Sequence, residues 1–97
     1  MSYAIEITRP AEKFLDRLSK QQPSDAEAIE DTIEALASEP RPSGCTALKG
    51  YSGVWRVWVR GYRISYQVKD DKLIVLVLTI STRDDVYEVL RRYLGRR

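Results

Sequence analysis

The spacing of apolar residues changes halfway along this chain. Over residues 10–37 apolar side chains recur every three or four positions, which is typical of helices with one buried face. Over residues 54–68 they alternate with polar ones, which is typical of strands with one buried face. Helices that precede a run of consecutive strands favour an α+β fold over an alternating α/β one.

Two helices are predicted in the first half. The first begins at Pro10, where a missing N–H costs nothing. The second begins with a capping box formed by Ser24 and Glu27, and it ends before Pro40. The short connection around Pro23 predicts an antiparallel helical hairpin. The two apolar stripes consist of Ala11, Phe14, Leu15 and Leu18, then of Ala26, Ile29, Ile33, Leu36 and Ala37.

Strands are predicted before and after these helices in the sequence. One covers residues 3–8, and three follow a loop at 41–53, over residues 54–60, 62–68 and 72–80. The last is apolar on both faces, which is typical of a central strand. A short C-terminal helix completes the order β-α-α-β-β-β-α. We therefore predict one domain, residues 1–97, with an antiparallel sheet packed against the N-terminal helical hairpin.

The residue types present exclude several kinds of chemistry. The chain has no histidine and a single cysteine, Cys45, which rules out internal disulfides, Cys/His zinc sites and His-dependent triads or dyads. The longest apolar run has six residues, against the ~20 that span a bilayer, and no signal peptide is apparent. We expect a cytoplasmic protein without a metal or a cofactor, and without a membrane partner.

Charge is distributed unevenly. Residues 1–40 carry four basic against nine acidic groups, a net charge of −5, whereas residues 41–97 carry twelve basic against five acidic groups, a net charge of +7. A basic half of this size indicates an anionic partner, most often nucleic acid. The alternative is that the two halves neutralise each other in the folded domain.

Basic and aromatic side chains share one face of the predicted sheet. If Trp55, Val57 and Val59 face the helices, the residues between them lie on the far face, because successive side chains of a strand alternate. Guanidinium groups there can bind phosphates, and an exposed indole can stack on a base. The residues expected on this far face are Arg56, Trp58, Arg60 and Arg63.

These residues also have structural interpretations. An arginine on a sheet face can simply be solvated. Trp58 can pack beneath the C-terminal helix, against Leu90 or Tyr93, instead of stacking on a base. Tyr62 and Tyr66 belong to the apolar set and are expected in the core.

Several motifs resemble the RelE toxins of bacterial and archaeal toxin–antitoxin systems. The length and the order of elements are also similar to those of the RelE/ParE superfamily. The resemblance covers essentially the whole chain, and its specific part is the C-terminal half. The matching motifs are Leu48-Lys49-Gly50, Trp55-Arg56-Val57, Gly61-Tyr62-Arg63-Ile64-Ser65-Tyr66, Thr82-Arg83 and Asp85-Val86-Tyr87.

The resemblance implies a ribosome-dependent endonuclease that cuts mRNA codons in the A site. It assigns catalytic roles to Arg56, Arg63, Arg83 and Tyr87, and an RNA-binding role to Lys49. Many relatives have a second basic residue at the position of Trp58. Either Arg60 supplies the missing charge or Trp58 stacks on the RNA, and both residues are assigned to RNA binding.

The chemistry expected of such a site needs few groups. The 2′-OH of RNA is itself the nucleophile, and arginines can stabilise the charge that develops on the phosphate. No side chain of this sequence is plainly tuned for proton transfer near neutral pH. We therefore expect poor cleavage of free RNA and a dependence on the ribosome.

The resemblance also implies partners. They are a cognate antitoxin, the ribosomal A site with its mRNA, and operator DNA only through the antitoxin complex. Two other functions stay open: a ParE-like inhibitor of DNA gyrase, and a non-toxic homologue that only binds an antitoxin.

Overall fold

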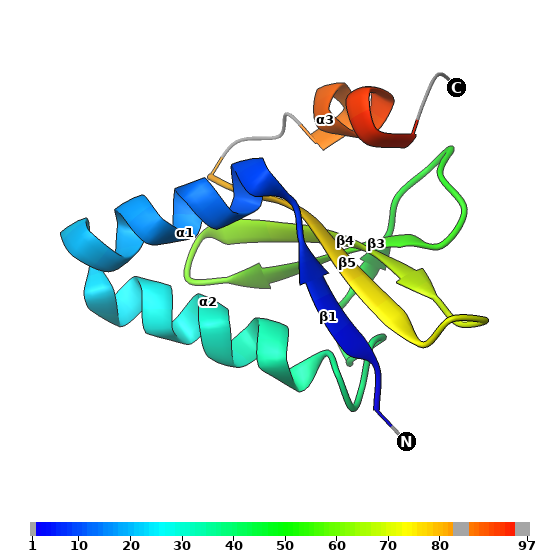
Figure 1. Ribbon diagram of the computed structural model, residues 1–97, viewed down its shortest axis with the longest axis horizontal. Helices are drawn as coiled ribbons and strands as arrows, with labels where there is room; N and C mark the ends of the chain where they lie inside the picture. The colour runs from blue at the N-terminus through cyan, green and yellow to red at the C-terminus, as the bar shows by residue number, and fades with distance from the viewer. Residues whose placement is uncertain (1, 83–85, 95–97) are drawn as a thin grey trace.

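The computed structural model describes residues 2–82 and 86–94 of the chain. A five-stranded sheet with the strand order β1-β5-β4-β3-β2 is packed against two N-terminal helices (Figure 1). The predicted α+β class is confirmed. The elements are β1 (Ala4–Ile7), α1 (Arg9–Gln21), α2 (Pro23–Ala35), β2 (Thr46–Ala47), β3 (Val54–Val59), β4 (Tyr62–Lys69), β5 (Ile74–Ser81) and α3 (Val86–Leu94).

The direction of β1 corrects the predicted antiparallel sheet. Strands β2 to β5 pair in an antiparallel manner, but β1 pairs in parallel with β5, with Ala4 opposite Ile74 and Ile7 opposite Val77. The α1–α2 hairpin connects β1 to the rest of the sheet. The alternation of side chains along β1 does not show whether this strand will run parallel or antiparallel to its neighbour. Because β1 pairs with β5, β5 lies between β1 and β4. This confirms the prediction that the strand with two apolar faces is a central one.

The start of α2 differs from the predicted capping box. Pro23 occupies the first helical turn, Gln22 is the N-cap residue, and no side chain caps the helix. Proline is suited to the first turn because its φ is fixed and its missing N–H needs no partner. Ser24 therefore lies inside the helix, where its hydroxyl oxygen accepts a hydrogen bond from Arg60. At α1, Pro10 lies in the first turn as predicted, and the Ala11 N–H donates to Thr8 Oγ1.

The main core lies between the α1–α2 hairpin and the sheet. Burial of a side chain the size of leucine contributes about 1.5–3 kcal/mol, so this layer supplies most of the driving force for folding. Tyr62 and Tyr66 belong to it, as predicted, and the Tyr66 hydroxyl donates to the carbonyl oxygen of Pro40 at 2.7 Å. The buried residues of this cluster include Ala11, Leu18, Ala26, Ile29, Ile33, Ile64, Val75, Val77 and Ile80.

Strand β5 contributes apolar residues to two layers, and a β-bulge interrupts its alternation. Tyr66 pairs with Val77 and Ser65 with Thr79, so that Leu78 is an extra residue. Val77 packs toward the hairpin, whereas Leu78 joins a second, smaller cluster with Leu48, Val54 and Leu90 of α3. Leu76 and Leu78 alternate normally with Val75 and Val77, and beyond the bulge Ile80 returns to the hairpin side. The bulge thus keeps Ile80 in the main core, while Leu78 lies on the face where α3 docks.

Candidate nucleic-acid interface

Arg56, Trp58 and Arg63 lie together on the face of the sheet turned away from the hairpin, and we call these three residues the arginine face. Trp55 and Val57 pack against the hairpin core, so the residues between and beyond them point the other way. Arg63 lies directly opposite Trp58 in the register of β3 and β4. The prediction that these three residues share the far face is confirmed.

The indole of Trp58 is the centre of the arginine face. The Cζ atom of Arg63 lies 4.6 Å from the ring centroid, and that of Arg56 lies 5.6 Å from it. Both distances are within the range of cation–π interactions. Half of the Trp58 surface is exposed (50%), so the interpretation that this residue is buried beneath the C-terminal helix is wrong.

Arg63 is also anchored to the end of β5. Its Nη1 donates to the carbonyl oxygen of Thr82 at 2.6 Å. A charge-assisted hydrogen bond of this length fixes the guanidinium beside the residue that precedes Arg83. Arg83 itself was predicted to be catalytic, and it lies outside the described residues.

Tyr87 and Lys49 lie at another part of the site. Tyr87 is in the first turn of α3 with 38% of its surface exposed, and its ring centroid is 5.9 Å from that of Tyr51. Tyr51 belongs to the loop between β2 and β3, which also carries the exposed Lys49. The two predicted residues therefore belong to segments that meet through this aromatic pair. Tyr51 was not predicted from the sequence as a residue of the site. An aromatic residue between Gly50 and Ser52 in a loop is a signal that could have identified it.

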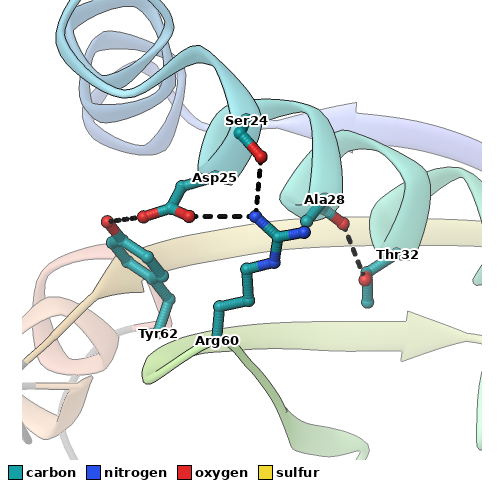
Figure 2. A network of polar contacts seen from close by, with 6 residues as sticks. All are labelled: Ser24, Asp25, Ala28, Thr32, Arg60 and Tyr62. Carbon is teal, nitrogen blue, oxygen red and sulfur yellow. Dashed lines mark hydrogen bonds and ion pairs between the residues drawn. The ribbon is translucent and has the colours of Figure 1, made fainter.

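Arg60 does not lie on the arginine face, which corrects its prediction. Its Nη1 donates to Ser24 Oγ at 2.9 Å and to Asp25 Oδ1 at 3.1 Å, both on α2 (Figure 2). The Tyr62 hydroxyl donates to the other carboxylate oxygen at 3.0 Å, and this hydrogen bond, with burial, raises the pKa of Tyr62. Arg60 and Gly61 have φ angles of 48° and 80°, so the alternation of β3 stops before Arg60.

Two buried oxygen atoms lie on the sheet beside the arginine face. Ser65, opposite Arg56, is only 1% exposed, and Gln67 follows it on the same face of β4. Neither Ser65 Oγ nor Gln67 Oε1 has a hydrogen-bond partner among the described residues. This polar floor was not recognised in the sequence, because the alternation shows only that the two side chains point away from the hairpin.

The arginine face is suited to a chain of phosphates and bases. Guanidinium groups match the geometry of phosphate oxygens, and an exposed indole offers a surface for stacking. Among residues 2–82 and 86–94, no three acidic or cysteine side chains are grouped so as to hold a metal ion. No helix within these residues is long and apolar enough to cross a membrane.

The sequence family agrees with this architecture. Residues 5–87 match the family described as the ParE toxin of the type II toxin–antitoxin system parDE. The chain belongs to the RelE/ParE toxin superfamily. The match covers β1 through the first turn of α3, so the toxin shares with its family both the hairpin layer and the strands that carry the arginine face.

Individual relatives come from archaea and bacteria. The toxin is 30% identical to the RelE1 protein of Methanocaldococcus jannaschii over 91 residues, which cover 91% of this chain and 98% of the relative. A mutant of the E. coli toxin RelE in the free state has a TM-score of 0.75 at 23% identity, covering 99% and 98% of the two chains. The archaeal RelE–RelB complex from Pyrococcus horikoshii has a TM-score of 0.73 at 22% identity, covering 88% and 99%. These two structures show the same fold.

Proposed function

We propose that this toxin is a ribosome-dependent mRNA endonuclease that cleaves codons in the ribosomal A site. The observation that carries the proposal is the arginine face, where Arg56 and Arg63 lie within 5.6 Å and 4.6 Å of the exposed indole of Trp58. A pair of guanidinium groups beside an exposed ring can bind an RNA phosphate and an adjacent base at the same time.

Cleavage would use the nucleophile that RNA carries. The 2′ oxygen attacks the adjacent phosphorus, the bond from phosphorus to the 5′ oxygen breaks, and the 2′ proton is lost while the leaving oxygen gains one. The products are a 2′,3′-cyclic phosphate and a 5′-hydroxyl. Arg63 and Arg83 would stabilise the negative charge that develops on the phosphate oxygens, with Arg56 beside them. Tyr87 would orient the nucleotide or assist proton transfer.

The ribosome would supply what the toxin lacks. Arginine stays protonated throughout the neutral pH range and transfers protons poorly, so the catalytic set acts mainly by alignment and charge stabilisation. Alignment requires that the mRNA be bent into an in-line geometry, which a bound A-site codon can provide. Lys49 would contact RNA phosphates at the edge of the site, and no cofactor is needed. Action on translating ribosomes would place the toxin in the cytoplasm.

An antitoxin is the second proposed partner. The support comes from relatives whose structures contain one, such as RelE with RelB from Pyrococcus horikoshii and the RelBE2 complex of Mycobacterium tuberculosis. An acidic antitoxin segment could cover the arginine face and exclude RNA from it, or it could displace α3 and move Tyr87 out of place. Operator DNA would be bound only through the antitoxin complex.

A second candidate function is inhibition of DNA gyrase. The matching family is described as ParE, which favours this alternative. The arginine face favours RNA cleavage, because a gyrase inhibitor needs no set of guanidinium groups around a stacking surface. A non-toxic homologue that only binds an antitoxin is the third possibility, since Trp58 replaces a basic residue of many relatives.

Brief induction in a bacterial host tests the proposal. New mRNA 5′ ends would be mapped for the wild type, for Arg83→Ala and Arg63→Ala, and for Arg17→Ala as a control that removes an exposed arginine from α1. We expect cuts at one reading-frame position of translated codons, lost in the first two variants and kept in the control. Growth arrest with DNA damage and without these cuts would overturn the proposal in favour of gyrase inhibition. Absence of arrest would favour the non-toxic homologue.

A further inference from the structure

We infer that Trp58 is a positioning residue that holds the guanidinium groups of Arg56 and Arg63 in place. The effect of this positioning on cleavage rests on the proposed function, whereas the positioning of the two arginines by Trp58 does not. This positioning explains how the toxin can dispense with the basic residue that many relatives carry at this position: the ring organises the two neighbouring charges instead of adding a third.

The register of the sheet brings the three side chains together. Arg63 is the cross-strand partner of Trp58, and directly opposed side chains have Cβ atoms about 4.5–5.5 Å apart. Arg56 lies two positions before Trp58 on the same strand and therefore on the same face. One indole thus contacts two cations, with ring-to-Cζ distances of 4.6 Å and 5.6 Å.

The electrostatic benefit is specific to an aromatic ring. Two guanidinium groups beside one ring repel each other, and each attracts the negative face of the indole. A leucine side chain would keep some apolar contact but would lack this negative face. An ammonium group at the same position would add a further repulsion. The ring therefore lowers the free energy of a geometry in which both cations lie beside it.

The position of Trp58 separates this role from a structural one. Among the described residues, neither apolar cluster includes Trp58, and half of its surface is exposed. Replacement of this side chain should therefore leave the core intact. Trp55, which packs against the hairpin and has the guanidinium of Arg41 at 5.6 Å from its ring, provides a matched control on the opposite face.

The geometry can be tested without any assay of activity. In NMR spectra of the full chain, the Nε–Hε signals of Arg56 and Arg63 should be shifted upfield by the indole ring current. We expect Trp58→Leu to abolish these shifts, Trp58→Phe to retain them in part, and Trp55→Leu to change only the signal of Arg41. Unshifted signals in the wild-type protein would overturn the inference, and backbone amide spectra would verify that each variant is folded.

The catalytic consequence is tested by single-turnover cleavage of mRNA on purified ribosomes. Two cation–π contacts at an exposed site correspond to a loss of about five- to thirtyfold in Trp58→Leu, with most of the rate retained in Trp58→Phe. In an Arg56→Ala/Arg63→Ala background, Trp58→Leu should cause a much smaller loss, because the part of its effect that acts through these arginines is already gone. An equal loss in both backgrounds would mean that Trp58 acts only by contacting RNA, and would overturn the positioning role.

The two proposals can fail separately. If the wild-type toxin cleaves no mRNA but its arginine signals respond to Trp58→Leu as expected, the proposed function fails and the positioning role stands. If cleavage is robust and Trp58→Leu cleaves at the wild-type rate, the positioning role fails and the proposed function stands.

Discussion

Asp25 accepts hydrogen bonds from two residues at the tip of the β3–β4 hairpin. Arg60 and Tyr62 donate to its two carboxylate oxygens at 3.1 Å and 3.0 Å. The Arg60 side chain is half exposed and that of Asp25 is about a quarter exposed, so solvent screens their attraction. These contacts connect the tip of the hairpin to the first turn of α2, which gives Arg60 a structural role.

Replacement of Arg60 should therefore affect stability and not cleavage. We expect Arg60→Ala to lower the free energy of unfolding by about 0.5–1 kcal/mol, because it removes a half-exposed ion pair. Urea denaturation measures this change, and growth inhibition by the variant should equal that of the wild type. Arg63→Ala is the comparison, since it removes the same charge from the arginine face. Loss of toxicity in Arg60→Ala at unchanged stability would restore an RNA-binding role to Arg60.

At the scale of elements, the described side chains of α3 include one that is fully buried, Leu90. It packs with Leu48, Val54 and Leu78, and Leu78 lies on this face because it alternates with Val77, which packs toward the hairpin. The α1–α2 hairpin instead rests on the larger cluster on the other face. Because the described residues of α3 join only the smaller cluster, we expect this helix to detach before the rest of the fold opens.

Truncation of Leu90 tests this separation. Leu90→Ala should weaken the docking of α3 by about 2–5 kcal/mol, the usual effect of removing a buried leucine side chain. Hydrogen exchange should accelerate in α3 and stay unchanged in α1 and α2. Under the proposed function, cleavage should also fall, since α3 carries Tyr87. Leu73→Ala, which truncates a partly exposed leucine, serves as the control. Equal acceleration of hydrogen exchange in all helices would show that α3 is not an independent unit.

At the scale of the whole molecule, segments far apart in the sequence meet at Asp70. This carboxylate accepts hydrogen bonds from the Tyr3 hydroxyl and from Arg41 Nη2, each at 2.6 Å. The residues come from the start of the chain, the segment after α2 and the β4–β5 turn. The Arg41 guanidinium, followed by the Tyr3 hydroxyl, lowers the pKa of Asp70, and the same carboxylate raises the pKa of Tyr3.

The lowered pKa of Asp70 predicts how stability depends on pH. A carboxyl group whose pKa is lower in the folded state stabilises the fold above its unfolded pKa of about 4, and this contribution is lost as the pH falls through the folded value. Urea denaturation between pH 2 and 7 should show a smaller loss of stability toward acid in Asp70→Asn than in the wild type. Asp71→Asn, in the same turn, is the control. Parallel pH profiles for Asp70→Asn and the wild type would contradict the prediction.

Charge is also organised at this scale. The acidic first 40 residues form the hairpin layer, and the basic remainder forms most of the sheet with the arginine face. The Arg60–Asp25 pair shows that some charges of the two halves do neutralise each other, as one of the two initial interpretations proposed. Arg63 lies instead against the ring of Trp58 and donates to a backbone carbonyl oxygen, which keeps the other interpretation, an anionic partner, in place.

The sequence by itself determined the α+β class, the order of elements apart from the two-residue strand β2 in the predicted loop, and the face on which Arg56, Trp58 and Arg63 lie. These features follow from hydrophobic periodicity and strand alternation, which are local properties that a sequence displays directly. The capping box was wrong because Ser24 and Glu27 match a local pattern, whereas Pro23 already occupies the first turn of the helix.

The tertiary structure alone decided the features that depend on strand register, turn geometry and strand direction. The parallel pairing of β1, the bulge at Leu78 and the contact of Tyr51 with Tyr87 each join segments that no local pattern relates. The side chain of Arg60 points toward Asp25 because both turn residues, Arg60 and Gly61, adopt positive φ angles. These angles end the side-chain alternation of β3. The pairing of Trp58 with Arg63 likewise required the register of β3 on β4, because a shift of one residue would move every side chain to the other face.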